Sequence, residues 1–201
     1  MKEKTCRFLE NICKAYLIFC IAFLSYPLFV NAGTEPVIMD INTSNPYLKK
    51  IAENHMTAVP YEIQEMLNES GWTITVENKR LTTENVGIAA GLAYLNENRI
   101  SLSGTPEDIK RALVHEIGHA VATELNNIDL SSEFVQIFEE EKDKFITKNS
   151  IGHGHETSSS REYFAECFRE YFYDRKNLKA RCPKTERFIH AFIMSIKNQA
   201  P

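Results

Sequence analysis

The segment His-Glu-Ile-Gly-His at residues 115–119 combines residue types that can bind a metal ion and move a proton. In an α-helix, residues four positions apart share a face, so His115 and His119 can direct their imidazole rings at one ion. Glu116 lies one step around the helix, where its carboxylate can take a proton from a water that zinc has made acidic. The segment therefore predicts a zinc hydrolase with Glu116 as its general base.

The helix that must carry this motif is predicted to begin after Gly104. Thr105 is a suitable N-cap, Pro106 suits the first turn, and Asp108 completes a capping box. The motif is flanked by apolar residues that a protein core would bury, namely Ala112, Leu113, Ile117, Ala120 and Val121. Chance alone would place such a motif in roughly one random chain of this length in a hundred, and the helical context argues against chance.

A third metal ligand is expected from a later segment, because catalytic zinc takes three protein ligands and keeps one position open. Glu162 and Glu166 lie four residues apart, so they too share a helical face. Either one could bind zinc while the other accepts a hydrogen bond from the free ring nitrogen of a ligand histidine. His153 or His155 would instead give a three-histidine site, and a solvated acidic helix is the alternative without a metal. The residue pattern alone leaves these alternatives open.

The N-terminal residues have the features of a secretory signal peptide. A basic start is followed by the apolar run Ala15–Val30 and by a small-residue cleavage site that ends at Ala32. We predict that residues 1–32 are removed and that the protein is secreted into the extracellular space. An uncleaved membrane anchor is the alternative, but the run is short for a membrane span and Pro27 interrupts it.

The remaining residues, 33–201, have the length of one domain. The whole chain has a net charge of −4 and the signal peptide is basic, so the mature domain is acidic. This charge argues against nucleic acid or an anionic membrane as a partner, and we expect a monomer that acts on a protein or peptide. Cys167 and Cys182 remain after cleavage, either as one disulfide bridge or as two buried thiols.

Local patterns predict an α+β domain with a small mixed sheet and a helical C-terminal half. A flexible lead-in from Gly33 to Asn45 should precede the regular elements. Strands are predicted at Trp72–Val76, Gly87–Leu95 and Arg99–Leu102, the last two joined by a hairpin at Asn-Glu-Asn. Besides the helix of the histidine motif, helices are predicted at Asn45–Met56, Pro60–Gly71, Ser132–Ile146, Ser160–Asp174 and Pro183–Ile196.

Four segments, in their order along the chain, resemble one protein family. They are His-Glu-Ile-Gly-His-Ala-Val, Phe-Val-Gln-Ile-Phe-Glu-Glu-Glu, Glu-Tyr-Phe-Ala-Glu-Cys-Phe-Arg and Cys-Pro-Lys-Thr-Glu-Arg-Phe-Ile. From about Pro60 to the C-terminus the chain is similar to the catalytic domain of anthrax toxin lethal factor and to the small secreted Pro-Pro endopeptidases that share its fold. The resemblance implies a zincin-like metalloprotease domain at residues 33–201 with one catalytic zinc ion.

The resemblance also implies roles that the spacing leaves open. In that family the first glutamate of the Glu-Tyr-Phe-Ala-Glu block binds zinc, which makes Glu162 the ligand and Glu166 a hydrogen-bond partner of a ligand histidine. The family has an oxyanion-stabilising tyrosine seven residues before this glutamate, where the present chain has His155. A histidine can donate the same hydrogen bond, so we expect His155 to be catalytic. A shift of the loop would bring in His153, and a solvated loop histidine is the alternative without a function.

Together these observations favour a secreted zinc metalloendopeptidase of extracellular proteins that cleaves next to proline, as the small Pro-Pro endopeptidases do. An extended substrate would lie along the strand Arg99–Ser103, just before the zinc helix. One alternative is a toxin-type protease subunit that is delivered into host cells. Another is a weakly active zinc-dependent binding module, which the missing tyrosine would favour.

Overall fold

The computed structural model describes residues 39–83, 87–146 and 154–199. The predicted signal peptide and His153 lie outside these ranges, so cleavage and secretion stay predictions. Across the described ranges, no helix has both the length and the apolar character needed to cross a membrane.

A mixed sheet of four strands has the order β1-β2-β6-β5. Strands β1 (Ile41–Asn42), β2 (Thr73–Val76) and β6 (Arg99–Leu102) are parallel, whereas β5 (Gly91–Tyr94) is antiparallel to β6. The predicted hairpin joins β5 to β6, and Asn98 in its turn adopts a left-handed backbone conformation with a φ of 47°. The predicted α+β class with a small mixed sheet is confirmed.

The fold also contains strands that the local patterns missed, in the main sheet and in a separate two-stranded sheet. The predicted lead-in includes β1, in which Ile41 is buried and pairs with Ile74 of β2. A strand of two residues is too short to produce a recognisable alternation of polar and apolar residues. The predicted strand Gly87–Leu95 is in fact two strands, because its first part, β4 (Gly87–Ala89), pairs with β3 (Leu81–Thr83) and not with the main sheet.

The edge of the main sheet differs from the prediction as well. Strand β6 pairs with β2 on one side and with β5 on the other, so it is an interior strand. The prediction that Arg99–Ser103 offers a free edge to a substrate is therefore wrong, and β5 is the edge on that side. Strand order depends on pairing between distant segments, which a local pattern cannot show.

The helices α2 (Pro46–Met56), α3 (Tyr61–Glu69) and α4 (Pro106–Glu124) begin within one residue of their predicted starts. Thr105 accepts a hydrogen bond from the backbone amide of Asp108 at 3.1 Å, as an N-cap should. The reciprocal half of the predicted capping box does not form. The backbone amide of Thr105 donates to the carbonyl of Ser103, and the Asp108 carboxylate lies 3.6 Å from Nε of Arg80.

The C-terminal half is helical, with α5 (Ser132–Glu141), α6 (Ser160–Tyr173), α7 (Arg175–Arg181) and α8 (Pro183–Gln199). Helix α5 is shorter than predicted and is followed by a 3-10 turn, η2 (Lys142–Lys144). Helix α7 was not predicted. It is separate from α6 because Asp174 ends α6 and caps α7, accepting a hydrogen bond from the backbone amide of Asn177 at 3.3 Å.

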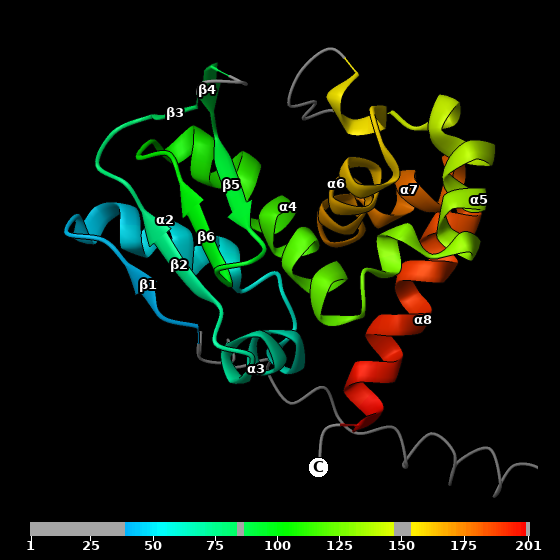
Figure 1. Ribbon diagram of the computed structural model, residues 1–201, viewed down its shortest axis with the longest axis horizontal. Coiled ribbons are helices and arrows are strands. Elements are labelled where there is room, and N and C mark those ends of the chain that lie inside the picture. The colour runs from blue at the N-terminus through cyan, green and yellow to red at the C-terminus, as the bar shows by residue number, and fades with distance from the viewer. Residues whose placement is uncertain (1–38, 84–86, 147–153, 200–201) are drawn as a thin grey trace, which may run out of the picture. The chain divides into compact units, whose positions relative to one another are not determined.

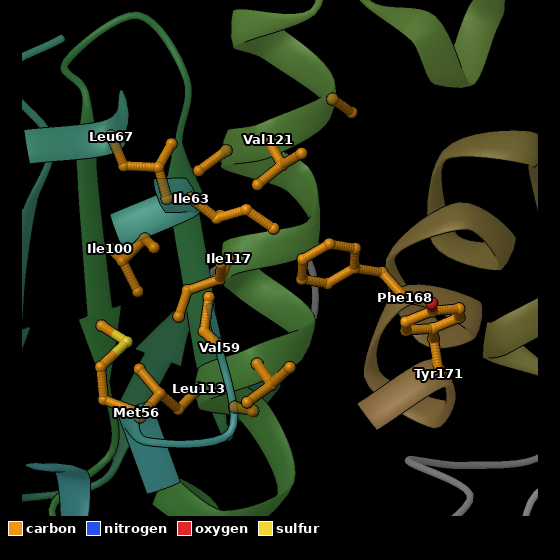
Figure 2. Close-up of a cluster of buried hydrophobic side chains, with 14 of the residues drawn as sticks. Met56, Val59, Ile63, Leu67, Ile100, Leu113, Ile117, Val121, Phe168 and Tyr171 are labelled. Carbon is orange, nitrogen blue, oxygen red and sulfur yellow. The ribbon is translucent and has the colours of Figure 1, made fainter. Parts of the chain in front are cut away.

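Helix α4 packs against both the sheet and α6 (Figure 1). On its sheet side, Leu113 and Ile117 are fully buried together with Ile100 of β6, whereas Phe168 approaches α4 from α6 (Figure 2). Each such side chain contributes about 1.5–3 kcal/mol when it is buried. Packing on two sides therefore fixes the helix that carries the histidine motif.

Cys167 and Cys182 are both buried and both free. The thiol of Cys182 lies 3.7 Å from the carbonyl oxygen of Glu141, and burial raises the pKa of both thiols. Of the two alternatives for this pair, the structure shows buried thiols, which pack as small apolar residues.

Candidate active site

Three side chains from two helices converge at one point. His115 and His119 project from the same face of α4, and Glu162 comes from the first turn of α6. Oε2 of Glu162 lies 3.2 Å from Nε2 of His115 and 3.5 Å from Nε2 of His119, and the three donor atoms all lie within 4.8 Å of one another. Two imidazole nitrogens and one carboxylate oxygen form a donor set that suits a catalytic zinc ion.

Glu166 lies one turn further along α6, on the other side of the His115 ring. Its Oε2 is 3.1 Å from Nδ1 of His115, which leaves Nε2 of that ring directed at Glu162. The structure therefore places the two glutamates at opposite nitrogens of one imidazole. A carboxylate at the second ring nitrogen orients a metal-binding histidine and makes it a stronger ligand.

Arg169 is a buried residue behind the site that the sequence analysis missed. Its Nη2 donates to Oε1 of Glu166 and to Oε1 of Glu170, and its Nη1 donates to the carbonyl of Arg111 on α4 at 3.1 Å. These contacts hold Glu166 in place and tie α6 to α4. The i,i+3 spacing of Glu166 and Arg169 is a signal that could have indicated the ion pair.

The charges at the site are strongly coupled. Burial alone would lower the pKa of His115, but the hydrogen bonds with Glu162 and Glu166 outweigh it and raise this pKa to about 10. Burial would raise the pKa of Glu162, but the hydrogen bonds with His115 and His119 hold it well below its usual range. Glu162 is therefore anionic at neutral pH, as a metal ligand must be, and metal binding would release the proton of His115.

Glu116 is buried and lines a groove of about 670 Å³. Burial raises the pKa of its carboxyl group, while the charges of His115 and His119 and a backbone hydrogen bond from Ala93 lower it. The groove is also lined by residues 88–93 and Leu95, and by His155, Arg161 and Glu162. Glu116 therefore lies between the edge strand β5 and the three convergent ligands.

His155 lines the groove from the 3-10 turn η3 (His155–Thr157). Its Nδ1 is 3.3 Å from Oε2 of Glu162, and 47% of its side chain is exposed. It is not part of the group of three donors that could hold one ion. The structure thus brings His155 beside the candidate ligands, where its ring can reach a substrate in the groove. Its alternative, His153, lies outside the described residues.

Gly118, inside the histidine motif, permits the close approach of α4 and α6. A Cβ atom at this position would lie 2.8 Å from Cα of Ala165 and 3.2 Å from its carbonyl oxygen. Both atoms belong to the backbone of α6, so neither could move without moving the helix. Because glycine has no side chain, α4 and α6 can lie close enough to bring Glu162 and Glu166 to the histidines.

Two comparisons with known proteins relate this geometry to a family. Residues 95–192 match the family model described as anthrax toxin lethal factor, N- and C-terminal domain. The predicted resemblance to that family is confirmed. Among curated proteins, none is similar enough to match the chain.

The solved structure of the Pro-Pro endopeptidase from Paenibacillus alvei is similar to this protein, with a TM-score of 0.62 and 21% sequence identity. The match covers 77% of this chain and 96% of the other. A likeness at this level of identity establishes the fold. Together with the family match, it supports a metallopeptidase.

Proposed function

We propose that the chain is a secreted zinc metalloendopeptidase that hydrolyses peptide bonds in extracellular proteins. The observation that carries the proposal is the convergence of His115, His119 and Glu162 at a groove that Glu116 also lines. If these three side chains formed only an ion pair between helices, they would need neither a groove of this size nor the buried carboxylate of Glu116 beside it. Zinc hydrolases need both, because a substrate and a water must reach the metal together.

His115, His119 and Glu162 would hold one zinc ion, which supplies polarisation of the substrate carbonyl and a lowered pKa for water. Glu116 would take the proton from the attacking water and deliver it to the leaving amine. Its burial raises its pKa, which suits a group that must both accept and release a proton near neutral pH. His155 would donate a hydrogen bond to the carbonyl oxygen as negative charge develops on it.

We further propose cleavage next to proline. Along β4 and β5 the groove is lined by the small residues Ala89, Ala90 and Ala93 together with the apolar Ile88, Leu92 and Leu95. Apolar side chains suit pyrrolidine rings, and the alanines leave room for such rings close to the backbone of β5. Proline also lacks a backbone N–H and has a fixed φ, so a site shaped for it would disfavour ordinary peptides. The fold shared with a Pro-Pro endopeptidase supports this preference.

Cleavage of a peptide library by the purified mature protein tests the activity, with Glu116→Gln as the control. We expect cleavage by the wild type that is lost on chelation and restored by zinc. Wild-type protein that binds zinc but cleaves no better than the Glu116→Gln control would instead indicate a binding module. Equal rates on proline-containing and proline-free peptides would support the protease activity but refute the proposed preference for proline.

Expression of the full chain in a secretion-competent bacterial host tests the proposed localisation. We expect the protein in the medium, with Gly33 as its first residue by N-terminal sequencing. Full-length protein in the membrane fraction would establish the anchor instead.

A further inference from the structure

Gly91, the first residue of β5, lies unusually close to α4. A Cβ atom at this position would lie 2.8 Å from Cβ of Ala112, 2.8 Å from Cγ of Glu116 and 2.9 Å from Oε1 of Glu116. Its backbone is not in the left-handed region, so conformational freedom does not explain a glycine here. The space itself requires it, as a glycine in a strand often indicates a close approach.

The three close contacts differ in what could yield. Cβ of Ala112 is fixed to the backbone of α4, and Ala112 is only 1% exposed. The Glu116 carboxylate is the mobile end of a side chain and can rotate away. The same carboxylate accepts a backbone hydrogen bond from Ala93, two residues further along β5. An added methyl group at residue 91 would therefore displace Glu116 and break its bond to Ala93.

We infer that Gly91 is a positioning residue for the general base. Because glycine has no side chain, β5 can contact Glu116 directly. The carboxylate is then held between the backbone at Gly91 and the amide of Ala93. Gly91 does not act on the substrate itself; it acts through Glu116. This inference rests on the proposed function, because it takes Glu116 as the base.

The other described glycines have different roles. A Cβ atom at Gly71, Gly87 or Gly154 would meet nothing within 4 Å, and these residues have positive φ angles. At Gly104 and Gly118 it would meet mainly the backbone of a neighbouring segment. Within the described part of the chain, Gly91 is thus the glycine whose close contacts reach a side chain of the proposed catalytic set.

The test is the Gly91→Ala variant of the mature protein, assayed beside the wild type and Glu116→Gln. We expect unchanged zinc content, a KM within about twofold of the wild type and a kcat lower by about a hundredfold, since small misplacements of catalytic groups have effects of that size. A wild-type kcat in Gly91→Ala would overturn the inference.

A second variant separates the positioning of Glu116 from simple packing. Gly91→Ala combined with Ala112→Gly removes the clash with the helix and keeps both clashes with Glu116, with Ala112→Gly alone as the control. We expect the double variant to regain thermal stability relative to Gly91→Ala but not kcat. If kcat also returns, Gly91 merely packs against α4 and the inference is wrong.

A crystal structure of Gly91→Ala tests the inference without any assay. We expect the Glu116 carboxylate to be rotated away from the amide of Ala93, with β5 still paired to β6. A carboxylate that keeps its bond to Ala93 would contradict the inference even if the enzyme had lost activity. A wild-type protein no more active than Glu116→Gln would refute the proposed function but not this inference. The crystal structure of Gly91→Ala would still show whether the added methyl group displaces Glu116.

Discussion

The candidate site has two faces that are built differently. On the buried face, α4 packs on α6, and His115, Glu166 and Arg169 are at most 3% exposed and linked by hydrogen bonds. On the groove face, α4 meets β5 and α6 meets η3, and the side chains of Glu162 and His155 are 25% and 47% exposed. Glu162 and Glu166 are the same residue type on the same side of α6, one helical turn apart, yet Glu162 belongs to the groove face of the site and Glu166 to its buried face.

This difference shows that one side of a metal site can position the ligands while the other side stays accessible to a substrate. The buried face fixes ring orientation and helix spacing through contacts that water cannot enter. The groove face leaves the donor atoms and Glu116 where a substrate can reach them. Substitutions on the buried face should therefore lower stability and, through the orientation of His115, metal affinity. Substitutions on the groove face should lower turnover with less effect on stability, in the case of Glu162 through loss of the zinc ion itself.

Glu116→Gln should have the largest effect on turnover and little effect on stability. Glutamine keeps the size of the side chain but cannot accept the proton, so kcat should fall about a thousandfold or more. Zinc content and the melting temperature should match the wild type. Kinetics and metal analysis of the same preparation check this, and an active variant would place the base elsewhere.

His155→Phe should lower kcat by about a hundredfold with little change in KM, because the ring would no longer donate a hydrogen bond to the oxyanion. His155→Tyr should regain part of the rate, since its hydroxyl can donate instead. Steady-state kinetics of both variants test the role. Wild-type rates in His155→Phe together with a loss in His153→Phe would mean that the other loop histidine is the donor.

Gly118→Ala probes the buried face and should have a smaller effect. The added methyl group would push α6 from α4, which should lower the free energy of unfolding by about 1–3 kcal/mol. Zinc affinity should fall as well, because Glu162 and Glu166 move with α6. Denaturant unfolding measures this, with Lys110→Ala, at an exposed position of α4, as a control that should change stability by no more than about 0.5 kcal/mol. Wild-type stability in Gly118→Ala would contradict the account of helix spacing.

The residues that α4 and α6 bring to the site are the part that the sequence predicted best. A helix through residues 115–119 necessarily brings His115 and His119 to one side, and Glu162 and Glu166 share a face for the same reason. These relations are local and follow from helix geometry. The residues alone could not decide which glutamate faces which nitrogen of His115, because that depends on how α6 is rotated against α4.

The groove face was predicted less well because distant segments build it. The edge strand was assigned to Arg99–Ser103, whereas pairing across the sheet makes β5 the edge. Gly91 was treated as an ordinary strand residue, since its contact with Glu116 exists only after β5 and α4 pack together. Neither the strand order nor this contact has a local signature in the sequence.

Zinc titration of Glu162→Ala and Glu166→Ala tests the central claim, that the two glutamates lie on different faces of one metal site. Loss of Glu166 should weaken zinc binding by roughly 10–100-fold, the usual effect of removing a partner of a ligand histidine. It should also lower the melting temperature, because Arg169 loses a buried partner. Loss of Glu162 should weaken zinc binding far more and leave the melting temperature of the metal-free protein less affected. If Glu166→Ala loses zinc and Glu162→Ala retains it, the ligand assignment is wrong by one helical turn.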